Sequence, residues 1–347
     1  MIEKDATILK QYTGPLSRSI QDEYAISPEH YRGDVKLGLR NSDGTGVLVG
    51  VSRVGSVQGY LLQDGQRVPI PGQLYYRGIE LTDIVEAHRG AGTFGFEEVA
   101  YLLLMGYLPS KSELVYFDKI MNQARKLPEG FTEGMIMRHP SRDIMNDLAR
   151  SVLLLYSYDE NPDDLSQANV LRQCLQLIAI FPLLAVYGYQ SFQHYHMGKS
   201  LFIHLPKPEL STAESLLQIL RESGEYSPLE AKILDLAMVL HAEHGGGNNS
   251  TFTVHVVTSS GTDTYSAVAA ALGSLKGPRH GGANVKVVRM FDDMMQNVNI
   301  EKEGEIKDYL VKLLDGQAFD RAGLIYGMGH AVYSLSDPRA DILMKCA

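Results

Sequence analysis

Apolar residues recur every three or four positions along most of the chain beyond about residue 90, and this spacing is typical of one buried face of an α-helix. The pattern predicts helices over residues 93–105, 141–156, 212–223, 228–241 and 263–276. The last segment is the clearest, because it is rich in alanine and ends at Lys276-Gly277-Pro278, a strong helix stop signal. Its many small residues indicate close packing, either in a domain core or against a second subunit.

The strongest apolar run extends from Leu177 to Tyr189 and is interrupted by Pro182. The run is too short to span a bilayer, so we interpret it as a buried, kinked helix and predict no membrane partner. A second apolar run surrounds His255 and resembles a strand, which predicts that His255 is a core or interface residue.

Residues 46–78 have a different character from the rest of the chain. Short β-branched runs such as Val47–Val49 occur here, and Asp64-Gly65 lies between two apolar runs, which is a hairpin signal. Residues 1–40 give only weak helical signals. The predicted fold class is therefore mainly α, with a small N-terminal β region.

Composition limits the possible functions. A chain of 347 residues, 44% of them hydrophobic, is long enough for two domains, and its net charge of −9 argues against nucleic acid as a partner. The two cysteines, Cys174 and Cys346, are far apart, which excludes a disulfide framework and fits a reducing compartment. The polar start, Met1-Ile2-Glu3, does not resemble a signal peptide, so we expect a cytoplasmic protein.

Three histidines, His244, His280 and His330, lie in glycine-rich segments where backbone can approach a ligand closely. His280 follows a helix stop and precedes a predicted helix, whose N-terminal dipole favours a neutral imidazole that can donate a hydrogen bond. Taken alone, His280 is equally well explained as a histidine held by backbone in a tight loop. Arg339, in Asp337-Pro338-Arg339, offers a two-pronged donor for a carboxylate, although alone it is typical of a surface helix start.

Other ligands find less support in the sequence. His241 and His244 are three residues apart, but no third ligand follows, so we predict no metal site. The glycine-rich segments match neither the Walker A motif nor the Gly-x-Gly-x-x-Gly nucleotide fingerprint. The bare backbone of Gly327-Met328-Gly329 could instead read the hydrogen-bonding edge of a planar ring such as adenine.

Taken together, the segment Gly277-Pro278-Arg279-His280-Gly281-Gly282-Ala283-Asn284, the segment Gly327-Met328-Gly329-His330-Ala331-Val332 with Arg339 nine residues after the histidine, and His244 with Asn248 and Ser250 resemble citrate synthase. The resemblance extends upstream to about Tyr76. It implies a two-domain helical fold, with a large domain over residues 1–276, which includes the hairpin region 46–78, and an incomplete small domain over residues 277–347.

The resemblance implies a condensation of acetyl-CoA with oxaloacetate, followed by hydrolysis of the citryl thioester. In that family the histidine at His280 hydrogen-bonds the enol oxygen, and the histidine at His330 polarises and protonates the ketone of oxaloacetate. His244, Asn248 and Arg339 would bind oxaloacetate. The backbone at Tyr326, Gly327, Met328 and Gly329 would bind the adenine of the coenzyme A substrate, with no tightly bound cofactor and no metal. The family also implies a homodimer.

The chain departs from the family pattern at three points. Gly245 stands where the family usually has glutamate, and Ser334 stands where a basic residue often helps to bind the phosphate of CoA. The family's catalytic aspartate would lie beyond Ala347, so we expect these 347 residues alone to turn over at no more than a trace rate. Two alternatives stay open: a 2-methylcitrate synthase that uses propionyl-CoA, and a non-catalytic homologue or folded fragment.

Overall fold

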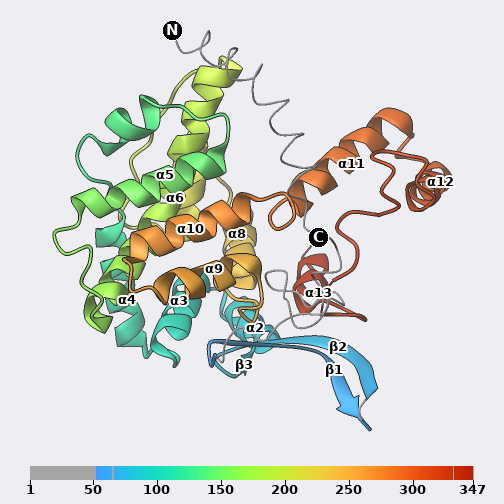
Figure 1. The fold of residues 1–347 in the computed structure, drawn as a ribbon, viewed down its shortest axis with the longest axis horizontal. Coiled ribbons are helices and arrows are strands. Elements are labelled where there is room, and N and C mark those ends of the chain that lie inside the picture. The colour runs from blue at the N-terminus through green and yellow to red at the C-terminus, as the bar shows by residue number, and fades with distance from the viewer. Residues whose placement is uncertain (1–51, 65, 331, 347) are drawn as a thin grey trace, which may run out of the picture. The chain divides into compact units, whose positions relative to one another are not determined.

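The computed structural model describes residues 52–64, 66–330 and 332–346 (Figure 1), so the predicted strand segment at 47–49 lies outside the described residues. The elements, in chain order, are β1 (Gly55–Gln63), β2 (Gln66–Tyr76), β3 (Ile79–Glu80), α2 (Leu81–Ala91), α3 (Phe96–Met105), α4 (Lys111–Ala124), a π-helical segment (Thr132–Met137), α5 (Ile144–Leu155), a 3₁₀ turn (Tyr156–Tyr158), α6 (Gln167–Met197), α7 (Thr212–Leu220), α8 (Pro228–His241), α9 (Asn249–Thr258), α10 (Thr264–Lys276), α11 (Ala283–Asn297), α12 (Glu303–Leu314) and α13 (Pro338–Met344). The predicted fold class, mainly α with a small β region, is confirmed.

The β region is a three-stranded antiparallel sheet in the order β1-β2-β3. The predicted hairpin is confirmed, because β1 and β2 pair around the Asp64-Gly65 position with Gln63 opposite Gln66. Asp64 has a φ of +52°, a left-handed conformation that aspartate tolerates better than most residues. The buried end of β2 packs with α13, since Ile342 lies in one apolar cluster with Leu74 and Tyr76.

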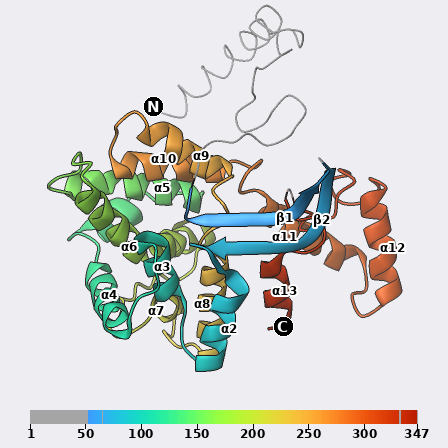
Figure 2. The same ribbon diagram turned by 90° about the horizontal axis from the view of Figure 1, so that it is seen from below.

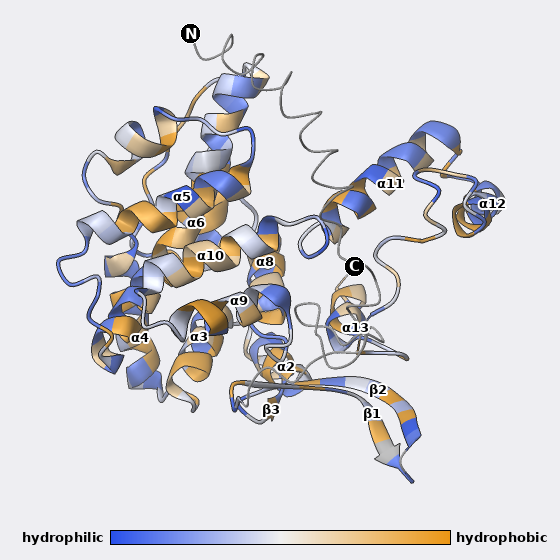
Figure 3. Cartoon of the chain, viewed as in Figure 1, coloured by the Kyte–Doolittle hydropathy of each residue, from blue (hydrophilic) through white to orange (hydrophobic). Residues whose placement is uncertain are grey.

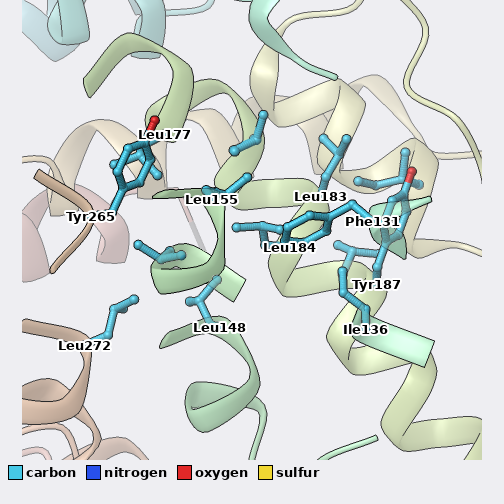
Figure 4. Packing of buried hydrophobic residues seen from close by; sticks show 14 residues of the cluster. Phe131, Ile136, Leu148, Leu155, Leu177, Leu183, Leu184, Tyr187, Tyr265 and Leu272 are labelled. Atoms are coloured by element: carbon cyan, nitrogen blue, oxygen red, sulfur yellow. The ribbon is translucent and has the colours of Figure 1, made fainter. Parts of the chain in front are cut away.

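The largest apolar cluster joins α5, α6 and α10 (Figure 4). Its fully enclosed side chains include Val152 of α5, Ile180 and Leu184 of α6, and Tyr265 of α10. Each buried aliphatic side chain of this size contributes about 1.5–3 kcal/mol relative to an exposed one. Figure 3 shows the same concentration of apolar residues on these three helices. This cluster is the core of the helical body.

Helix α6 corrects one premise of the sequence interpretation. The apolar run at Leu177–Tyr189 alone is too short to cross a membrane, but the helix that contains it has 31 residues and a window of mean hydropathy 1.7, which is long and apolar enough. Half of that window is buried inside the protein, and Pro182 lies within the helix without ending it. The burial supports the prediction of a core helix.

Helices α9 and α10 carry a second correction. The predicted strand around His255 is instead α9, and the His255 side chain is exposed, so it is not a core residue. The periodicity was ambiguous because a short run rich in Thr and Val suits either element. Helix α10 is confirmed, with Asp263 as its N-cap accepting a hydrogen bond from Ser266 N–H at 2.8 Å. It packs against α5 and α9.

Helices α11 and α12 form a separate apolar cluster around Met290, Met294, Tyr309 and Leu313. Figures 1 and 2 both show α12 at the opposite end of the helical body from α4. The boundary between residues 276 and 277 stays a prediction.

Candidate active site

Three rings from two distant segments meet at the centre of the candidate site. The ring centroids of His244 and His330 are 5.1 Å apart in an edge-to-face arrangement. Tyr333 stacks on His330 at 4.6 Å and meets the edge of His244 at 5.6 Å. The structure therefore brings together two of the three histidines that the sequence singles out.

Glycine backbone gives the two histidines their positions. His244 is followed by Gly245, whose φ is +74° and whose missing Cβ would lie 2.6 Å from Val57 Cγ2. No other residue type fits this conformation and contact without strain. His330 follows Gly327 and Gly329, with φ of +88° and +86°.

The proton of His330 is assigned by its backbone contacts. Its Nδ1 accepts hydrogen bonds from the N–H groups of Val332 and Tyr333, both at 3.0 Å. A neutral ring that accepts at Nδ1 carries its proton on Nε2. Burial lowers the pKa of His330, although the nearby Asp337 carboxylate opposes the shift. His330 is therefore a neutral donor at physiological pH.

His244 is also neutral. Burial lowers its pKa to about 4, and the charge of Arg339 acts in the same direction. Its Nε2 is buried and has no hydrogen-bond partner among the described residues. A buried, unpaired nitrogen of this kind is costly unless a ligand or water satisfies it. A ligand or an enclosed water would satisfy this nitrogen.

Arg339 lies at the start of α13, directly after Pro338. Its Nε and Nη2 donate to the two carboxylate oxygens of Asp337 at 3.0 and 2.7 Å. Burial raises the pKa of the Asp337 carboxyl, but the hydrogen bonds and charge of Arg339 outweigh it and hold the pKa below its ordinary value. The remaining guanidinium hydrogens make no hydrogen bond within the described part of the chain, so they can bind a second carboxylate.

His280 is placed by a different element. Its Nε2 accepts a hydrogen bond from Ser250 N–H at 3.3 Å and lies 3.1 Å from Ser250 Oγ, at the start of α9. Acceptance from the N–H group puts the ring proton on Nδ1. A Cβ at Gly281 or Gly282 would lie 2.1 or 2.2 Å from a carbonyl oxygen, so this turn requires glycine. No contact within residues 52–64, 66–330 and 332–346 joins His280 to the three-ring cluster, and convergence of all three histidines stays a prediction.

The remaining predicted residues have mixed surroundings. Asn248 caps α9, because its Oδ1 accepts from Thr251 N–H at 2.9 Å and Ser250 Oγ at 2.7 Å. Only its amide N–H₂ group is left for a substrate. Met328 is 75% exposed in its glycine-rich loop, and the Tyr326 hydroxyl donates to Asp320 at 2.6 Å. Their predicted roles stay predictions.

Sequence reasoning did not find the roles of three residues in this site, Tyr333, Asp337 and Ser250. Tyr333 is buried against both histidine rings, and its hydroxyl donates to the backbone carbonyl of Gln73 in β2 at 3.4 Å. Asp337 orients Arg339, and Ser250 orients His280. Tyr333 and Asp337 were visible as the residues three after His330 and two before Arg339, but spacing alone does not reveal stacking or pairing. No group of three or more potential metal ligands lies together in the part of the chain that the structure describes.

Residues 43–347 match the family model described as the C-terminal domain of citrate synthase. The chain belongs to the citrate synthase family. Its similarity to the citrate synthase of Haloferax volcanii is 33% identity over 316 residues, covering 90% of this chain and 73% of that protein. Similarity to the 2-methylcitrate synthase of Shewanella oneidensis is 32% over 272 residues, covering 78% of this chain and 65% of that protein.

Solved structures of the citrate synthase family show the same fold. The citrate synthase of Pyrobaculum aerophilum superposes with a TM-score of 0.70 at 28% identity, covering 87% of this chain and 68% of that one. The Thermoplasma acidophilum enzyme, in a ternary complex with carboxymethyl coenzyme A and oxaloacetate, superposes with a TM-score of 0.69 at 25% identity, covering 86% and 70%. The chain spans about two thirds of the length of the relatives it matches.

Proposed function

We propose that the function of this protein is to condense acetyl-CoA with oxaloacetate to give citrate and CoA. The observation that carries the proposal is the contact between His244 and His330, with the charge of Arg339 acting on both rings. Two neutral imidazoles beside a guanidinium suit a substrate that presents carboxylates around a ketone.

In this proposal, Arg339 binds a carboxylate of oxaloacetate through the hydrogens that Asp337 leaves free. His330 donates its Nε2–H to the ketone oxygen, and His244 Nε2 meets a polar group of the same substrate. The two imidazoles are neutral before the reaction. Their hydrogen bonds to the substrate therefore strengthen as negative charge develops on the ketone oxygen.

The second substrate is the thioester of coenzyme A, bound through the loop Tyr326–Gly329. His280 donates its Nδ1–H to the thioester oxygen as a proton leaves the methyl group, which stabilises the enol. The enol carbon attacks the ketone carbon of oxaloacetate, and His330 gives its Nε2 proton to the new alkoxide. The imidazolate that remains then regains a proton from water. Water then hydrolyses the thioester and releases CoA. No residue among those that the structure describes is assigned as the base that removes the methyl proton.

Calorimetry and a thiol-release assay test the proposal together. Oxaloacetate should bind the chain, and Arg339→Ala should weaken binding, because a charge-assisted pair is lost. Arg221→Ala, which breaks an exposed pair with Glu230, is the matched control and should bind normally. Oxaloacetate that does not bind, or binds equally well to Arg339→Ala, would contradict the proposal.

The similarity to a 2-methylcitrate synthase supports a second candidate, with propionyl-CoA as the thioester. The same residues serve either reaction, so the assay should be run with both thioesters in parallel. A ratio of kcat/KM in favour of propionyl-CoA would select this alternative. Binding of oxaloacetate without CoA release from either thioester would select a non-catalytic role for these residues alone.

We also propose a cytoplasmic homodimer. Cys174 and Cys346 are free thiols, which suits a reducing compartment. Apolar side chains on the outer faces of α9 and α10, including Val256 at 53% exposure and Leu275 at 38%, would suit a partner helix pair. Light scattering on the purified chain should give the mass of a dimer, and a monomer at micromolar concentration would contradict this part.

A further inference from the structure

The loop before His330 folds back on α11, and one carboxylate ties the two together. Asp320 Oδ2 accepts hydrogen bonds from the Tyr326 hydroxyl at 2.6 Å and from Lys286 Nζ at 2.5 Å. Its Oδ1 accepts from the N–H of Ala322 at 3.2 Å. Lys286 also lies 5.1 Å above the centre of the Tyr326 ring. A single side chain thus connects a helix to a loop.

The two partners of Asp320 stand close in sequence to two of the candidate histidines. Lys286 lies in the first turn of α11, six residues after His280, and Tyr326 lies four residues before His330. His280 and His330 are otherwise separated by fifty residues. The Asp320 contacts therefore join the segment that follows one histidine to the segment that precedes the other.

Backbone conformation around Asp320 sets it apart from an ordinary surface residue. Phe319 and Arg321, on either side of it, have φ of +52° and +58°. They are two of four non-glycine residues with positive φ among the described residues. Such conformations persist only where the surrounding structure holds them, and they concentrate at functional sites.

Packing supports the same connection. Phe319, Ile325 and Tyr326 lie against the apolar cluster of α11 and α12. A Cβ at Gly327, whose φ is +88°, would lie 3.1 Å from Val287 Cγ2, so the glycine-rich loop runs close against α11. Asp320 adds polar contacts, to Lys286 and Tyr326, to this apolar packing of the loop against α11.

We propose that Asp320 is a positioning residue that holds the His330 loop against α11, so that the segments carrying His280 and His330 move as one unit. It acts through Lys286 and Tyr326 and touches no substrate. The inference rests on the proposed function only for what the histidines do, because its test requires no turnover. A solvated surface pair, the simpler alternative, would leave the loop in place when broken.

The test is an NMR titration of the chain labelled with ¹³C in its histidine rings, with the His330 signal assigned through His330→Asn. Burial holds the pKa of His330 below its ordinary value, so a loosened loop should raise it. Asp320→Ala and Tyr326→Phe should each shift the His330 titration upward. Lys286→Gln should act in the same direction, and Lys286→Arg, which keeps the charge and donors, should restore the original titration.

Two controls separate positioning from general destabilisation. Glu305→Gln removes the carboxylate charge from the exposed Lys302–Glu305 pair, 2.8 Å long, at the start of α12, and should leave the His330 titration unchanged. His88, whose Nδ1 lies 2.9 Å from Thr93 Oγ1, reports whether the rest of the fold is intact. If Asp320→Ala also changes the titration of His88, the test depends on Tyr326→Phe and Lys286→Gln, because each of these variants removes only one hydrogen-bond partner of Asp320.

An unchanged His330 titration in Asp320→Ala and Tyr326→Phe would overturn the inference. An equal shift in Glu305→Gln would overturn it too, because it would show a response to any loss of stability. Failure of the proposed function would give a different result. The chain would not bind oxaloacetate in calorimetry, while the His330 titration would still respond to the Asp320, Tyr326 and Lys286 variants as predicted.

Discussion

Gly245 allows the most direct test of how backbone geometry holds His244, because three consecutive glycines have different surroundings. Gly245 has a φ of +74° and a Cβ position 2.6 Å from Val57 Cγ2, whereas Gly246 has a φ of +68° and only an ordinary contact of 3.7 Å. Gly247 has no positive φ, and nothing lies within 4 Å of its Cβ position. The three alanine variants therefore separate strain from collision.

The expected magnitudes follow from these contacts. Gly247→Ala should be neutral or stabilise by about 0.4–1 kcal/mol, since it reduces the freedom of the unfolded chain. Gly246→Ala should cost about 1–2 kcal/mol for a left-handed alanine. Gly245→Ala carries that strain plus about 1–3 kcal/mol for the overlap with Val57, or about 2–5 kcal/mol in total.

Urea denaturation followed by circular dichroism gives the free energy of unfolding for each variant. The order of stability should be Gly247→Ala, then Gly246→Ala, then Gly245→Ala. Because Gly245 adjoins His244, its variant should also weaken oxaloacetate binding, while Gly247→Ala should not. Equal stability of the Gly245 and Gly247 variants would refute the reasoning, since it would mean that the loop relaxes freely.

Three further predictions concern pH, helix capping and the core. The depressed pKa of His244, about 4 against an ordinary 6.5, means that the unfolded chain binds its proton first as the pH falls. Stability should therefore decline between about pH 6.5 and 4, and His244→Gln should flatten that part of a urea-midpoint profile. Asp263→Ala removes the cap of α10 and should cost about 1 kcal/mol in the same assay, whereas a loss under 0.3 kcal/mol would mean that water replaces the cap. Leu184→Ala in the core should cost about 2–5 kcal/mol, whereas Leu205→Ala, at a residue 78% exposed, should stay within about 0.5 kcal/mol; similar losses would contradict the assignment of the core.

The sequence was most informative where local chemistry and tertiary packing agree. Helix α8 runs from Pro228 to His241 as predicted, because Ser227 forms a capping box with Glu230 and apolar residues follow at helical spacing. The hairpin at Asp64 was predictable because a short turn motif determines the pairing of its neighbours. Both features depend on residues that are close together along the chain.

Features that depend on distant residues were harder to predict. The run around His255 was misread because threonine and valine favour strands in isolation, and packing against α10 selects the helix. The stacking of Tyr333 on His330 and the bond of Ser250 to His280 join segments that no spacing rule connects. The glycine-rich motifs located the histidines, but only coordinates reveal which nitrogen of each ring is occupied.

The backbone contacts of His280 and His330 have a consequence for control of the site. Each ring is held as one tautomer by main-chain N–H groups, of Ser250 in one case and of Val332 and Tyr333 in the other. Histidines in many enzymes are instead oriented by a carboxylate. Here the choice between proton donor and proton acceptor at each exposed nitrogen is a property of loop conformation. A change in the conformation of either loop would therefore change which ring nitrogen carries the proton without any change in pH.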